Sequence, residues 1–282
     1  MRNVSFRSGR RCGGQKRYRS MIEIRSRNNE RLKALLELAR SRKEREKRRC
    51  VLVDGGKLCR DAVETGHKLL ELWITETASS RDPALFKRLS DAASETFLLQ
   101  DHAAEKISDL KAPQGIWGVF QTPDLAEPEI LCKGTRVLGI CEVQNPENVG
   151  AMIRTASALG YDGILVSSDS ADLWSPRVIR AGALAQFNLP VCVSDDLVLT
   201  VKRMNDAGFV SCASALDKTA RSVDEVPAKG KILLLIGNEG HGIPEELLNV
   251  CTERIYLPMS HGVDSLNAAA AAAILMWELR DK

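Results

Sequence analysis

The sequence predicts an α/β protein of two domains, a smaller one towards the N-terminus and a larger one built on a mostly parallel sheet. Short apolar runs of strand length alternate with helical stretches along most of the 282 residues, a pattern typical of parallel sheets covered by helices. The alternation is interrupted over residues 122–135, where Pro123, Pro128 and Gly134 stand among polar residues and indicate a linker.

The composition is that of a soluble globular chain. Hydrophobic residues make up 44% and charged residues 27% of it, so each domain is able to bury its own core. The longest apolar run, from Ala268 to Trp277, is shorter than the ~18 residues that would cross a bilayer. We therefore expect no membrane association.

Charge is distributed unevenly along the chain. Residues 1–50 carry 18 Lys and Arg against 5 Asp and Glu, a net of +13, whereas the remainder carries 22 against 32, a net of −10. The basic end is therefore a candidate surface for a polyanion, and the basic residues of 42–49 are expected to contact phosphates. A solvated helix face with a flexible tail is the alternative, and charge alone does not decide between the two.

The eight cysteines and four histidines are scattered. No two cysteines form a C-x-x-C pair, and no histidine lies at metal-ligand spacing from them. Scattered thiols within apolar runs are typical of a reducing compartment. We expect no bound metal and a cytoplasmic protein.

Residues 1–27 are expected to form a basic, disordered extension. Residues 1–20 contain seven basic residues, no acidic residue and no apolar core of a secretory signal. An organelle transit peptide is the alternative, because such peptides are also rich in arginine and poor in acids. Met21 could serve as an alternative start.

Residues 28–121 are expected to form the smaller domain. Leu32, Leu35 and Leu36 fall on one face of a helix over residues 29–49. The elements expected after it are strand 50–53, helix 57–64, strand 69–75, helix 83–93, strand 96–99, helix 103–110 and strand 115–121.

The larger domain is expected over residues 136–282. Helical stretches separate its apolar runs, and this rhythm implies a mostly parallel sheet with helices on both faces. The runs of buried-strand length are 137–143, 163–166, 189–193, 209–213 and 232–236.

The first of three segments that carry chemistry runs from Gln144 to Arg154. It follows a strand and enters a helix that ends near Gly160, and Asn148 is a candidate N-cap for that helix. Arg154 lies about one and a half turns beyond it among apolar neighbours. A capped helix whose arginine points to solvent is the alternative.

The second segment, from Leu233 to Gly242, is a buried strand that ends in three glycines interleaved with polar residues. Glycines at such a place let a ligand approach the backbone closely. The pattern is neither the G-x-G-x-x-G fingerprint nor a phosphate loop, because the glycine spacing differs and the Lys-Ser/Thr pair is missing. An ordinary strand-to-helix turn is the alternative.

The third segment joins Ile-Tyr-Leu-Pro-Met at residues 255–259 to Ser265-Leu266-Asn267 and a run of six alanines. Ser265 is a candidate cap for the last helix. The alanines permit close approach of neighbouring backbones. A C-terminal helix that merely packs on the sheet is the alternative.

Taken in this order, the three segments resemble the signature motifs of the SpoU (TrmH) family of RNA ribose 2′-O-methyltransferases. The first motif of that family has Asn and, six residues on, Arg, as at Asn148 and Arg154. The second is a strand ending in Gly-x-Glu-Gly-x-Gly, and the third is Ile-x-x-Pro-Met followed by Ser-Leu-Asn. The residues that match these two are Gly237, Glu239, Gly240, Gly242, Ile255, Pro258, Met259, Ser265, Leu266 and Asn267.

The resemblance covers nearly all of the chain after residue 27. Residues 175–181 resemble a further family segment, and residues 28–121 resemble the RNA substrate-binding domain that many members carry. The chain departs from the family pattern at Asp54, Gly182 and Ala268, none of which is assigned to the chemistry. Because of these departures, the motifs do not assign the chain to one subfamily.

The resemblance implies a fold, a cofactor and a reaction. Residues 136–282 would form a trefoil-knotted α/β methyltransferase domain, an exception to the rule against threaded chains. S-adenosyl-L-methionine would methylate a ribose 2′-oxygen by in-line displacement, with alignment of the two reactants as the first source of rate. The cofactor would lie against Ile236, Gly237, Glu239, Gly240, Leu257, Met259, Ser265 and Leu266.

Catalytic roles are implied by the same motifs. They fall on Asn148, Arg154, Glu239, Ser265 and Asn267. The family places removal of the hydroxyl proton on Arg154, although a guanidinium, with its pKa above ~12, is a poor base. Positioning of the adjacent phosphate or stabilisation of the developing alkoxide is the alternative for Arg154, with Glu239 as a partner for it or a positioning residue. His241 and His261 titrate in a suitable range but are not assigned, because loop histidines are common.

RNA is the expected partner, and the upstream domain favours ribosomal RNA. A homodimer is implied as well, with Ile274, Leu275 and Trp277 of the last helix at its interface. The alternatives are a tRNA 2′-O-methyltransferase, a non-catalytic RNA-binding member of the same fold, and a nucleotide-binding oxidoreductase or NTPase. The missing phosphate fingerprint argues against the last of these, and the complete set of polar motif residues argues against the non-catalytic protein.

Overall fold

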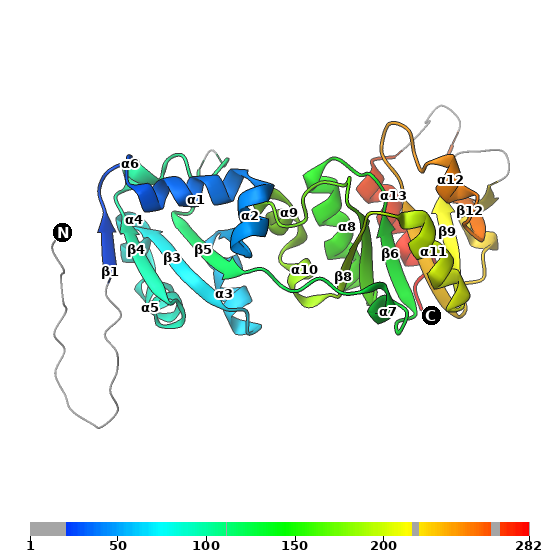
Figure 1. Cartoon of the computed structure of the whole chain (residues 1–282), viewed down its shortest axis with the longest axis horizontal. Coiled ribbons are helices and arrows are strands. Elements are labelled where there is room, and N and C mark those ends of the chain that lie inside the picture. The colour runs from blue at the N-terminus through cyan, green and yellow to red at the C-terminus, as the bar shows by residue number, and fades with distance from the viewer. Residues whose placement is uncertain (1–20, 111, 216–219, 261–265, 282) are drawn as a thin grey trace, which may run out of the picture. The chain divides into compact units, whose positions relative to one another are not determined.

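The structure is a computed structural model that describes residues 21–110, 112–215, 220–260 and 266–281. The chain divides into two compact units (Figure 1). The first contains residues up to Thr122 together with Trp174–Pro176, and the second contains Pro123–Leu173 and the residues from Arg177 on. The expected extension over residues 1–20, with the alternative transit peptide, lies outside the described residues, and so do Ser265 and His261.

The first unit is a five-stranded mixed sheet in the order β1-β4-β3-β5-β2, with β5 antiparallel to both of its neighbours. Helix α1 lies along one face, and α3 and α5 lie on the other (Figure 1). Its strands are β1 (Met21–Ile24), β2 (Cys50–Asp54), β3 (Leu69–Thr75), β4 (Glu95–Leu99) and β5 (Ile116–Gln121). Its helices are α1 (Glu30–Arg40), α2 (Arg42–Arg48), α3 (Gly56–Glu64), α4 (Glu76–Arg81), α5 (Pro83–Ala92) and α6 (Asp101–Ala104).

The core under α1 explains why this helix forms where it does. Asn29 caps its first turn, and Leu32, Leu35 and Leu38 are buried against the sheet. The rings of Trp73 and Phe97 stack beneath them with centroids 4.1 Å apart. Burial of large apolar side chains at helical spacing stabilises the helix more than its basic outer face could.

Three expectations for this unit are wrong. The single helix over residues 29–49 is two helices, because Ser41 takes an extended backbone and its Oγ accepts from the Glu44 N–H to cap α2. Residues 21–24 form β1 beside β4 rather than part of the disordered extension, since Ile24 is buried. The helix expected over residues 103–110 is only the short α6, and Ser108 instead accepts from the Leu110 N–H.

The second unit is built on a seven-stranded sheet in the order β10-β12-β9-β11-β6-β7-β8, and all of its pairings are parallel. The predicted parallel sheet is confirmed. Its strands are β6 (Arg136–Ile140), β7 (Gly163–Ser167), β8 (Val191–Ser194), β9 (Phe209–Ser214), β10 (Arg221–Ser222), β11 (Lys231–Ile236) and β12 (Glu253–Tyr256). Its helices are α7 (Pro128–Leu131), α8 (Pro146–Ala158), α9 (Pro176–Gly182), α10 (Ala185–Asn188), α11 (Leu197–Asp206), α12 (Glu245–Leu248), α13 (Ala268–Glu278) and the 3-10 turn η1 (Val223–Glu225).

Helices cover both faces of this sheet. Leu233 and Leu235 of β11 point towards α11 and α12, where Val201, Met204 and Leu247 complete a buried cluster. On the other face, α13 packs against α8 and β11, and α8 also packs against β6. Because all strands run in one direction, the loops after β6, β11 and β12 leave the sheet at the same edge.

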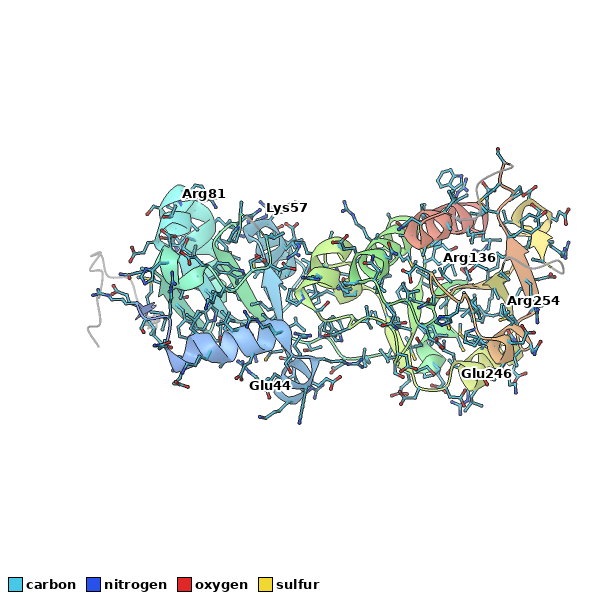
Figure 2. All side chains as sticks on the ribbon, turned by 90° about the horizontal axis from the view of Figure 1, so that it is seen from above. Glu44, Lys57, Arg81, Arg136, Glu246 and Arg254 are labelled. Carbon is cyan, nitrogen blue, oxygen red and sulfur yellow. The ribbon has the colours of Figure 1, made fainter. Side chains whose placement is uncertain are left out.

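Arg136, the first residue of β6, anchors the far end of α13 to the sheet (Figure 2). It is 2% exposed. Its Nε donates to the Leu279 carbonyl at 2.7 Å, and its Nη2 and Nη1 donate to the Ala228 and Gly230 carbonyls. One buried guanidinium therefore holds the C-terminal helix and the loop before β11 together.

Four expectations for the second unit need correction. The linker over residues 122–135 contains α7. Asn145 rather than Asn148 caps α8, since its Oδ1 accepts from the Glu147 N–H, and Asn148 is the third residue of the helix. Asn267 rather than Ser265 caps α13. Strands β10 and β12 were not expected as strands, because both are short.

No helix among the described residues is long and apolar enough to cross a membrane.

Candidate functional site

A cavity of about 530 Å³ opens where β11 and β12 end. Its volume lies within the ~300–1,000 Å³ that is usual for sites binding a drug-sized ligand. Seven of the eight residues expected to bind the cofactor line it, and the eighth, Ser265, lies outside the described residues. The seven are Ile236, Gly237, Glu239, Gly240, Leu257, Met259 and Leu266.

The glycine loop after β11 is closed on itself and leaves no room for a side chain at its start. A Cβ on Gly237 would lie 2.5 Å from the carbonyl carbon of Gly242 and 2.6 Å from the nitrogen of Ile243. The backbones of Asn238 and Gly242 exchange two hydrogen bonds of 3.0 Å, and the Asn238 Oδ1 accepts from the Gly240 N–H at 2.7 Å. The loop therefore presents its backbone to the cavity in a fixed shape.

A chain of three polar side chains connects the three motifs. The Asn267 Nδ2 donates to the Asn148 Oδ1 at 3.0 Å, and the Asn148 Nδ2 donates to the Glu239 Oε1 at 2.7 Å. Asn148 is 7% exposed, so its amide is held between partners rather than by water. Since Asn148 donates to a carboxylate, which can only accept, the direction of the whole chain is fixed. We call these three residues the amide relay.

Arg154 does not join the amide relay. It lies on α8 with an exposed side chain and is not among the residues that line the cavity. Six residues at ~100° each place it on a different side of the helix from Asn148. Two roles were expected for Glu239, pairing with Arg154 or positioning the site. Glu239 accepts a hydrogen bond from Asn148, and this contact favours the positioning role.

A histidine–carboxylate pair, which the sequence did not reveal, stands at the same cavity. The Nε2 of His241 lies 2.9 Å from the Oε2 of Glu142, and His241 lines the cavity. Glu142 lies two residues after the end of β6 and has a φ of 54°, a left-handed conformation uncommon outside glycine. The two residues are 99 positions apart, so only the fold brings them together.

Thiol chemistry is not available at this sheet edge. Burial, with a further contribution from Glu142, raises the pKa of the Cys141 thiol to about 12. Burial also raises the pKa of Cys251 to about 11. Both thiols therefore stay protonated at neutral pH and cannot act as thiolate nucleophiles. Across the ranges that the structure describes, no group of three or more His, Cys, Asp and Glu side chains is arranged to hold a metal ion.

Two family models match the chain. Residues 135–277 match the SpoU rRNA Methylase family, and residues 29–118 match the MRM3-like substrate binding domain. The first match spans the sheet, the cavity and the amide relay. The second lies within the first unit.

Curated relatives match along almost the whole chain. It is 30% identical over 260 residues to the 23S rRNA (guanosine(2553)-2′-O)-methyltransferase RlmP of Bacillus subtilis, which covers 92% of this chain and 100% of the relative. It is 28% identical to the mitochondrial rRNA methyltransferase 3 of Xenopus laevis, over 89% of this chain and 73% of that protein.

A solved structure shares the fold of both units. The SpoU methyltransferase AviRb of Streptomyces viridochromogenes, in complex with the cofactor AdoMet, is 25% identical with a TM-score of 0.75. The likeness covers 89% of this chain and 97% of AviRb. The expected fold class, a trefoil-knotted parallel α/β domain with a smaller N-terminal α/β domain, is confirmed by this likeness.

Proposed function

Because this chain belongs to the SpoU rRNA methylase family, we propose that it transfers a methyl group from S-adenosyl-L-methionine to a ribose 2′-hydroxyl of ribosomal RNA. The cavity after β11 and β12 is the observation that carries this proposal. Its walls are the loops of the second and third motifs, and the amide relay ends on its rim at Glu239.

The residues present fit the cofactor. Gly237 brings bare backbone to the cavity wall, where any side chain would collide. Leu257, Met259 and Leu266 add apolar surface for the flat adenine ring. The carboxylate of Glu239 lines the cavity and adds a negative charge there, which favours a sulfonium cation.

We assign the amide relay to positioning the ribose and Glu239, because its three members come from the three motifs and meet in one hydrogen-bonded chain. Arg154, exposed on α8, suits a contact with the phosphate next to the target ribose better than a role as base. Ser265, two residues before Asn267 in the third motif, would act with Asn267 to orient Arg154 or the ribose.

The substrate proposal rests on the relatives and on the first unit. Both relatives described above carry rRNA in their names, and the first unit matches a substrate-binding domain. Residues 28–121 would bind RNA while residues 136–282 carry the chemistry. Transfer RNA is the alternative substrate. The bacterial relative supports a cytoplasmic location. An organellar location is the alternative, because the other relative is mitochondrial.

We also propose a homodimer formed through α13. Ile274 and Trp277, one turn apart on this helix, are 44% and 51% exposed. Large apolar side chains on one exposed helical face suit a protein interface. Leu275, expected at the same interface, is buried within its own unit. Sedimentation at micromolar concentration should give a dimer, and a monomer would contradict the proposal.

The methyl transfer itself is tested with tritium-labelled cofactor and ribosomal or transfer RNA lacking ribose methylation. We expect label in ribosomal RNA, and mapping of alkali-resistant linkages should place it on a 2′-oxygen. Label in transfer RNA alone would move the substrate to the alternative class. Cofactor binding by calorimetry without transfer to either RNA would favour a non-catalytic RNA-binding protein.

A further inference from the structure

Most of the positive charge of the first unit is already neutralised within the unit. The majority of its cationic side chains lie within 3.7 Å of an acid. A cation beside an acid presents little net field to a distant polyanion, because the two charges largely cancel. The cations paired in this way are Arg25, Arg27, Arg31, Lys33, Arg42, Lys47, Arg48, Lys57, Arg60, Lys87 and Arg88.

A few cations of the first unit stand apart from these pairs. Within its described ranges, four exposed cations form neither an ion pair nor a side-chain hydrogen bond, namely Arg40, Lys43, Lys68 and Lys106. Lys106 follows α6, at the edge of the sheet where the parallel strands β3 and β4 end. The other three lie elsewhere, and an exposed cation without a counter-ion in the protein is available to a phosphate.

Lys68 lies at the opposite edge of this sheet, where β2 and β3 begin and β5 ends. The Gln121 N–H donates to the Lys68 carbonyl at 3.1 Å, and the Thr122 N–H donates to the Arg49 carbonyl at 3.0 Å. The residues just before β3 and β2 therefore flank the end of β5 on its two sides. At the ordinary strand spacing, their backbones are about 10 Å apart.

Helix α2 brings Arg40 and Lys43 to the same edge, because it ends one residue before β2 begins. Arg45 of α2 donates to two carbonyls near the end of α1, so the start of α2 lies against the last turn of α1. Arg48, at the other end of α2, lies 3.6 Å from Glu71 of β3. The end of α1, helix α2 and the start of β3 therefore form one continuous surface.

We propose that Arg40, Lys43 and Lys68, which we call the edge cations, form the surface of the first unit that contacts RNA phosphates. The inference rests on the proposed methylation of ribosomal RNA and assigns the RNA contact to one edge of one sheet. Each phosphate that a lysine or arginine neutralises releases condensed cations from the RNA, and this release makes binding depend on salt. A cation held by a neighbouring acid has to leave that partner first, so it contributes less.

Substitution of all three edge cations by glutamine tests the proposal directly. If each contacts one phosphate, the slope of log binding constant against log salt concentration should become smaller by about 2.1–2.7. Between 50 and 200 mM salt, wild-type affinity should then fall about 20- to 40-fold more than that of the triple variant. The edge cations are exposed and form no side-chain hydrogen bond, so the variant should melt at the wild-type temperature, as circular dichroism can verify.

A matched control removes the same charge from paired positions of the same unit. It combines Lys33→Gln, Lys87→Gln and Arg88→Gln, whose native side chains lie 2.8, 2.5 and 3.0 Å from an acid. Both triples lower the net charge by three, so a difference between them reports local contacts rather than the overall field. The control slope should change by less than about 0.9, the equivalent of one contact. Equal changes in the two triples, or a wild-type slope in the edge triple, would overturn the proposal.

Methyl transfer distinguishes failure of this inference from failure of the proposed function. With ribosomal RNA that lacks ribose methylation, the edge triple should raise KM for RNA and leave kcat within about twofold of wild type, because it removes binding that is uniform along the reaction. Wild-type transfer with an unchanged KM in the edge triple would overturn the inference and leave the proposed function standing. The expected difference in salt slope without any methyl transfer would support the edge cations and count against the proposed function.

Discussion

Asn267 carries two functions that substitutions can separate. Its Oδ1 accepts from the N–H groups of Ala269 and Ala270 and caps α13, while its Nδ2 donates to Asn148 in the amide relay. Asn267→Ala removes both functions. Asn267→Asp keeps an acceptor for the cap but has no proton to donate to Asn148.

The magnitudes follow from the contacts. Loss of the cap costs about 1 kcal/mol, and leaving the buried Asn148 Oδ1 without its donor costs a further 1–3 kcal/mol, roughly. Asn267→Ala should therefore unfold at a free energy about 2–4 kcal/mol lower than wild type. Asn267→Asp should lose less stability, because a carboxylate at a helix N-terminus is favourable by about 0.3–1 kcal/mol.

Activity should not follow stability in this pair. Asn148 can satisfy an Asp at position 267 only by turning its amide over, which would aim its carbonyl oxygen at the Glu239 carboxylate. Both variants should therefore lose most methyl transfer, about tenfold or more if one charge-assisted hydrogen bond is lost. Urea unfolding and single-turnover transfer are the two assays. Wild-type turnover in Asn267→Asp would refute the relay as a positioning device.

Three further predictions concern other parts of the chain. Arg136→Met should lower the free energy of unfolding by about 3 kcal/mol or more, because three carbonyls lose a buried donor, as urea denaturation can measure. Desolvation raises the pKa of Asp162, but the N–H groups of Thr135 and Arg136 donate to its carboxylate and lower that pKa overall. Wild type should therefore be more stable to unfolding than Asp162→Asn, with the full difference at neutral pH. The difference should shrink as pH falls below the ordinary carboxyl pKa of 3.8 towards the lower pKa of the folded state. If Lys43 contacts one phosphate, Lys43→Ala should reduce the slope of log binding constant against log salt concentration by roughly 0.7–0.9. Arg45→Ala should instead lower thermal stability, because Arg45 is buried and donates to the carbonyls of Leu38 and Ala39.

The strands of the larger sheet were predictable because each is a buried apolar run. In a parallel sheet both faces are covered, so β11 is apolar at every position from Ile232 to Ile236 and stands out in the sequence. The three motifs were predictable from their order and spacing. In the structure, seven of the eight expected cofactor residues line one cavity, although they come from two motifs that are separated in the chain.

The contacts between motifs were not predictable, because distant residues decide them. Asn145 and Asn148 are both residues that cap helices well, and the sequence does not show which one does so. In the structure Asn145 caps α8, and Asn148 donates to Glu239, which is 91 positions away in the chain. The basic stretch after Ala39 gives no periodic signal of the break at Ser41. Arg45 likewise reads as a surface charge in the sequence, whereas the bend between α1 and α2 buries it.

The glycine loop at residues 237–242 is fixed from two sides, and this bears on how the site would work. Asn148 holds it through Glu239, and Glu142 holds it through Asn238 and His241. A loop without regular secondary structure would ordinarily lose conformational entropy when a ligand orders it. Here that cost is met during folding by contacts from α8 and from the end of β6. Weakening either side should therefore loosen the loop and reduce cofactor affinity only modestly, while the geometry of the reacting groups, which tolerates less displacement, should suffer more.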